Sequence, residues 1–133
     1  MTDEGALLDR LRESAVGGDL PCVPCAVAHK LAESCATSPR AVGESASGLG
    51  IRITHCQLGL FGYDAYGEKR WTRRLATLPT ELERDVRQAC TDGRLTCAAA
   101  WLLADERGLP RLLLGSVAET LDVRICDCQL GCF

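Results

Sequence analysis

Four cysteines of this chain recur in two copies at a fixed distance. Residues 25–61 align without a gap to residues 97–133, 72 positions later, with 15 identities among 37 positions. This alignment pairs Cys25 with Cys97 and Cys56 with Cys128. Thiolates are preferred ligands of zinc and of iron-sulfur clusters. The repeat therefore predicts a duplicated unit whose four thiols bind a metal or a cluster.

The thiols can be combined in two ways, and the sequence leaves both open. In one, a four-thiolate set forms where the two units meet. In the other, each unit has its own site with local ligands: Cys22, Cys25 and Cys56 with His55 or Cys35 in the first, and Cys97, Cys126, Cys128 and Cys132 in the second. Cys22 and Cys25 have the CxxC ligand spacing, but Arg94 replaces Cys22 in the second copy. The CxxC motif is therefore weaker support than the repeated pair.

An iron-sulfur cluster is favoured over zinc as the bound group. Structural zinc sites have two closely spaced ligand pairs, whereas the repeated cysteines lie 31 residues apart within each copy. Thiols are also in surplus, because the chain has nine cysteines and only two histidines. The competing interpretation is that these cysteines fill space in the core, since free cysteine is among the most buried residue types.

Composition excludes several classes of function. The net charge of −3 and the pI near 5.4 argue against tight nonspecific nucleic-acid binding. Stretches typical of a secretion signal or a membrane helix are not visible, so a cytoplasmic protein without a membrane span is expected. Nine cysteines then favour metal or redox chemistry over disulfides. His55 is adjacent to Cys56 on an expected strand and points to the other face, which argues against nucleophilic catalysis and against an enzyme.

The elements that must position these thiols follow from apolar periodicity. Each copy is expected to have three helices and a strand. The first has helices over 2–16, 25–33 and 39–48, and the second has helices over 80–91, 97–105 and 110–120. A capping box is expected at Thr80 and Glu83. Strands over 51–58 and from residue 123 alternate apolar and polar residues, which predicts that Cys56, Cys126 and Cys128 point away from the isoleucine face.

Three short helices, a tight break between the second and third, a strand and a glycine turn resemble a winged helix-turn-helix unit. The resemblance implies a mainly α fold with short β, in which two tandem three-helix units pack together and are related by a pseudo-twofold axis. The expected domains are a first repeat over 1–61, a basic and aromatic linker over 62–79, and a second repeat over 80–133.

The same resemblance implies a second function, that of a DNA-binding regulator with redox- or metal-responsive cysteines. Its third helices would enter the major groove and carry Arg40 and Arg111. The linker would add a basic cluster, comprising Lys69, Arg70, Arg73 and Arg74. Both third helices are otherwise small or apolar, which favours packing over base reading. A protein partner is a third expectation.

Overall fold

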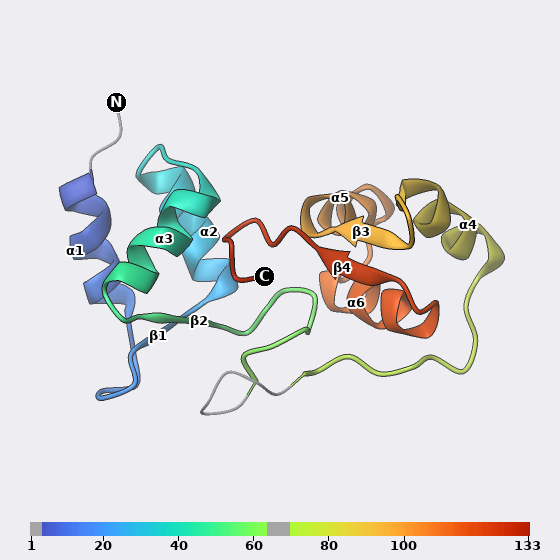
Figure 1. Cartoon of the computed structure of the whole chain (residues 1–133), viewed down its shortest axis with the longest axis horizontal. Coiled ribbons are helices and arrows are strands. Elements are labelled where there is room, and N and C mark those ends of the chain that lie inside the picture. The colour runs from blue at the N-terminus through green and yellow to red at the C-terminus, as the bar shows by residue number, and fades with distance from the viewer. Residues whose placement is uncertain (1–3, 64–69) are drawn as a thin grey trace. The chain divides into compact units, whose positions relative to one another are not determined.

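The fold is mainly helical with a few short strands, as the sequence predicts. A computed structural model of the chain describes residues 4–63 and 70–133. These residues form six helices and four three-residue strands (Figure 1). Within them, no helix is both long enough and apolar enough to cross a membrane.

The chain divides into two compact units, and each takes in a short segment from the other half of the sequence. The described part of unit 1 comprises residues 4–56, 61–63 and 129–132. Unit 2 comprises residues 57–60, 70–128 and 133. The segments 57–60 and 129–132 are the corresponding parts of the two sequence copies. They are called the exchanged segments below.

Unit 1 contains α1 (Glu4–Ser14), β1 (Cys22–Pro24), α2 (Cys25–Ser34), α3 (Pro39–Gly48) and β2 (Arg52–Thr54). Unit 2 contains α4 (Thr80–Ala89), β3 (Arg94–Thr96), α5 (Cys97–Arg107), α6 (Arg111–Thr120) and β4 (Arg124–Cys126). From β1 onward, each element of unit 1 begins 72 positions before its counterpart in unit 2.

In each unit a helical pair connects two parallel strands. β1 pairs with β2, with Val23 opposite Ile53, and β3 pairs with β4, with Leu95 opposite Ile125. Parallel strands need a long crossover connection, and the two helices provide it. This arrangement sets the first residue of the second helix next to the end of the first strand, which is where Cys25 and Cys97 lie.

Apolar side chains from every helix form the cores. Leu7 and Leu11 of α1 are buried against α2 and α3, as the periodicity predicts. In unit 2, Leu82 and Val86 of α4 are likewise buried. Leu130 of one exchanged segment is buried within unit 1, and Leu58 of the other is buried within unit 2. Each core therefore contains a leucine from the other sequence copy.

Two local predictions are wrong. The capping box does not form, because Pro79 is the N-cap and Thr80 is already the first helical residue. Glu83 instead pairs with Arg87 one turn later, at 3.3 Å. The strand expected over 51–58 is shorter and comprises only Arg52–Thr54. The helix start expected at Thr2 or Asp3 lies outside the described residues.

Candidate functional site

Cys25 and Cys97 each open the second helix of their unit, as predicted. Both are buried in the first turn, α2 following Pro24 and α5 following Thr96. Thr96 caps α5 by accepting a hydrogen bond from the Ala99 amide at 3.1 Å, whereas α2 has no side-chain cap. Uncapped amides and the positive end of the helix dipole favour a thiolate.

Cys56 and Cys128 do not face away from the core as predicted. Both are buried, at 5% and 6% exposure. The alternation fails because β2 ends at Thr54, and the next residue, His55, adopts a positive φ of 50°. In unit 2 the corresponding residue, Asp127, also has a positive φ, of 52°. This left-handed residue turns the chain, so the following cysteine points inward. Histidine and aspartate tolerate that conformation better than most residues, and this was the available sequence signal.

Tyr63 is hydrogen-bonded to the backbone of one repeated cysteine of unit 1, and the sequence predicts no role for it. Its hydroxyl donates a hydrogen bond to the Cys56 carbonyl oxygen at 2.5 Å. The pKa of Tyr63 is raised by burial, and further by repulsion from the Cys56 and Cys25 sulfurs when these are ionised. The His55 ring packs edge-on against Tyr63, with centroids 5.3 Å apart.

Backbone hydrogen bonds close the loop that follows each cysteine. The Cys56 amide donates to the Phe61 carbonyl at 3.1 Å, and the Cys128 amide donates to the Phe133 carbonyl at 3.2 Å. Gly59 and Gly131 provide the positive φ, 78° and 81°, that these six-residue loops require. These hydrogen bonds fix each cysteine backbone at the start of a closed loop.

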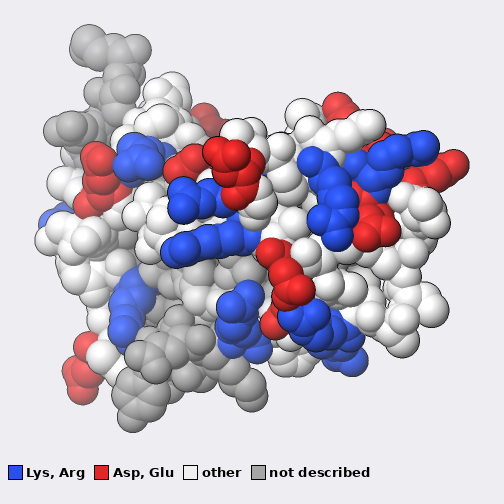
Figure 2. Space-filling model, turned by 45° about the vertical axis from the view of Figure 1, so that its right-hand side comes forward, with Lys and Arg blue, Asp and Glu red and all other residues white. Residues whose placement is uncertain are grey.

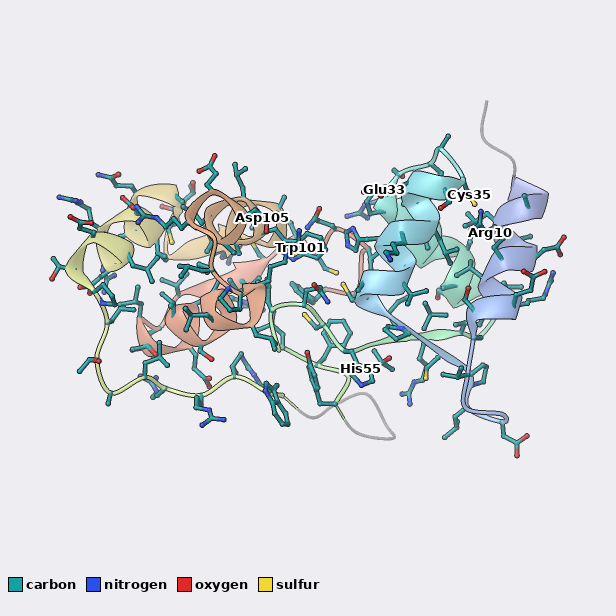
Figure 3. All side chains as sticks on the ribbon, turned by 180° about the vertical axis from the view of Figure 1, so that it is seen from behind. Arg10, Glu33, Cys35, His55, Trp101 and Asp105 are labelled. Carbon is teal, nitrogen blue, oxygen red and sulfur yellow. The ribbon has the colours of Figure 1, made fainter. Side chains whose placement is uncertain are left out.

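The secondary ligand candidates are spread over both units. Cys22 lies by the turn at Gly17, and Cys35 follows the C-terminal end of α2, where Figure 3 labels it. Cys35 lies ten positions after Cys25 along α2, a rise of about 15 Å. A shared metal is therefore excluded for that pair.

In the second copy, Cys126 lines a cavity of about 460 Å³ in unit 2 with Asp127 and Arg94. Cys132 is exposed and belongs to unit 1. The local set expected for the second copy is thus divided between units. Within residues 4–63 and 70–133, no three histidine, cysteine or acidic side chains are grouped as ligands of one metal ion.

The arginines proposed to contact DNA differ in their surroundings. Arg111 makes two hydrogen bonds to Asp105, at 3.1 and 2.8 Å, and its guanidinium lies 3.8 Å from the centre of the Trp101 ring. Figure 3 shows Trp101 and Asp105 together on α5. Arg40 of α3 is exposed. Arg40 is therefore more accessible to a phosphate or a base than Arg111.

Part of the expected linker packs against α6. The segment 70–79, called the strap below, belongs to unit 2. The Arg73 amide donates to Ser116 Oγ at 3.2 Å, and the Leu75 amide donates to Thr120 Oγ1 at 2.9 Å. Arg74 forms an exposed ion pair with Asp122. Arg70 is exposed, and Lys69 lies outside the described residues. The strap is thus a docked part of unit 2.

The strap and the exchanged segment 57–60 together leave α6 little free surface. Residues 114–118 are all buried, whereas α3 buries only Val42 and Ala46. A helix that reads DNA needs an accessible face, and α3 meets this condition better than α6. Figure 2 shows basic and acidic side chains interspersed over the visible face.

No protein-family model, curated protein or solved structure gives a significant match to this chain.

Proposed function

We propose that the repeated cysteines bind a metal ion or an iron-sulfur cluster, in a sensory or structural role. The observation that carries the proposal is made in unit 1, where Cys25, in the first turn of α2, and Cys56, at the start of a closed loop, are both buried. Their counterparts in unit 2 are also buried, at the same positions relative to the helix and the closed loop. Cysteine sulfur is the ligand type that soft metals prefer.

Two thiols per unit do not complete a four-coordinate site. Metal binding would have to draw further ligands into place, as happens where binding and folding are coupled. An iron-sulfur cluster remains the favoured group and zinc the alternative, since thiolates dominate the available ligands. The competing explanation is that the four cysteines serve only as core packing.

Purification without oxygen, followed by metal analysis and an absorption spectrum, tests the proposal. The isolated protein should contain iron with charge-transfer bands, or zinc that cobalt can replace. Cys56→Ala and Cys128→Ala should each lose metal, whereas Cys90→Ala, which changes a half-buried cysteine outside the aligned segments 25–61 and 97–133, should retain it. The ratio of metal to chain distinguishes the two ligand sets that the sequence left open.

A protein that contains neither iron nor zinc and takes up no cobalt would refute the metal proposal. Unchanged stability in the Cys56→Ala and Cys128→Ala variants would count equally against a structural metal.

DNA binding by tandem winged-helix units is the second candidate, and exposed Arg40 on α3 is the observation that favours it. The helix break between α2 and α3, followed by β2, supports the resemblance. Parallel pairing of β1 with β2 gives it no support, because the described strands form no hairpin. The affinity for duplex DNA at low salt should fall in Arg40→Ala and should change little in Arg111→Ala. Binding that is absent at low salt would remove this candidate.

A further inference from the structure

Gly43 of α3 and Gly115 of α6 are corresponding residues that each touch an exchanged segment. A Cβ on Gly43 would overlap the Leu130 carbonyl oxygen and lie 2.8 Å from its carbon. A Cβ on Gly115 would overlap the Leu58 carbonyl oxygen and lie 2.8 Å from its carbon. Backbone cannot give way as a flexible side chain does. Both positions therefore require glycine for reasons of space.

Local conformation does not explain these two glycines. Neither has a positive φ, and both lie inside helices. Glycine there costs about 1 kcal/mol relative to alanine. Both sequence copies nevertheless have glycine at this helical position. The close approach of a loop carbonyl accounts for this identity.

Each exchanged segment begins at the residue after a repeated cysteine. Cys56 is in unit 1, whereas Leu58, two residues later, is buried against α6 in unit 2. Cys128 is in unit 2, whereas Leu130 is buried in unit 1, where Gly43 lies. Because each loop is closed by a hydrogen bond from its cysteine, displacement of the leucine moves the cysteine as well.

We infer that Gly115 positions Cys56 and that Gly43 positions Cys128, so that each third-helix glycine serves the cysteine of the other sequence copy. The inference adds two positioning residues to the proposed site. Its test needs no metal, so it can fail while metal binding stands, and it can hold if metal binding fails.

The experiment measures the alkylation rate of each cysteine by iodoacetamide in the folded, reduced full chain, read by peptide mass spectrometry. Gly115→Ala should raise the rate at Cys56 about tenfold relative to Cys128, because an overpacked contact opens locally. Gly43→Ala should instead raise the alkylation rate at Cys128 relative to Cys56. Gly48→Ala is the matched control, since a Cβ at that helical position meets nothing within 4 Å.

The opposite pattern would overturn the inference. An ordinary local effect of Gly115→Ala would expose Cys97 and Cys128, which share its sequence copy, and leave Cys56 protected. An equal rise at Cys56 and Cys128 in a variant that keeps the wild-type circular dichroism spectrum would overturn it too.

If Gly43→Ala and Gly115→Ala do not fold, Leu58→Ala and Leu130→Ala test the same inference. These changes keep the glycines and loosen the exchanged segments. Leu58→Ala should expose Cys56 while raising amide hydrogen exchange in α6, and Leu130→Ala should expose Cys128 while raising it in α3. The inference would be contradicted if Leu58→Ala raised amide hydrogen exchange in α3 and Leu130→Ala raised it in α6.

Discussion

At the scale of single residues, Tyr63 holds the turn that presents Cys56. Tyr63→Phe removes the donor to the Cys56 carbonyl and should lower the free energy of unfolding by about 1 kcal/mol, the usual contribution of such a hydrogen bond. Alkylation of Cys56 should become faster, with Cys128 in the same molecule as the internal control. Equal rates in Tyr63→Phe and wild type would show that the hydroxyl does not order the turn.

Asp105 gives a prediction on pH at the same scale. Its pKa is lowered by the hydrogen bonds and charge of Arg111. A carboxylate with a depressed pKa stabilises the folded state above the ordinary aspartate pKa, near 4, and loses this contribution as the pH falls through the folded value. Urea unfolding should therefore separate wild type from Asp105→Asn at pH 7 and bring them together in strong acid. A difference that persists unchanged in acid would contradict this assignment.

At the scale of elements, the strap is held on α6 by two hydroxyl groups. Ser116 and Thr120 accept from strap amides, and their counterparts in the first copy, Glu44 and Gly48, have no hydroxyl. Ser116→Ala or Thr120→Val should each cost about 1 kcal/mol and speed hydrogen exchange at Arg73 and Leu75. Ser47→Ala, an exposed hydroxyl on α3, is the control. Unchanged exchange in the strap would mean that apolar contacts alone hold it.

At the scale of the whole chain, each unit contains a segment of the other sequence copy, so we expect the stability of one unit to depend on that of the other. Leu11 is fully buried in α1, so Leu11→Ala should cost about 2–5 kcal/mol in unit 1. Both tryptophans, Trp71 and Trp101, lie in unit 2. Because Gln57–Leu60 belongs to unit 2 and continues from unit 1, the urea midpoint followed by tryptophan fluorescence should fall as well. A fluorescence midpoint that stays constant while circular dichroism shows an earlier step would mean that the units unfold separately.

Much of the helical framework could be predicted from local sequence. Pro39, Gly108 and the apolar spacing of Leu7 and Leu11 mark helices that the structure contains, because these signals act over one or two turns. Strands β1 and β3 were missed, since three residues are too few to show a period. The burial of Cys56 was missed because one left-handed residue, His55, ends the alternation.

The duplication, the recurrence of Cys25 with Cys56, and the identity of Gly43 with Gly115 are properties of the sequence by itself. Tertiary structure decided what those residues touch. The loop after Cys56 is buried against α6, the strap is docked on that helix, and Tyr63 reaches the Cys56 carbonyl. The physical reason is that periodicity reports which face of an element is buried, whereas the partner that buries it is chosen by packing between segments far apart in the chain.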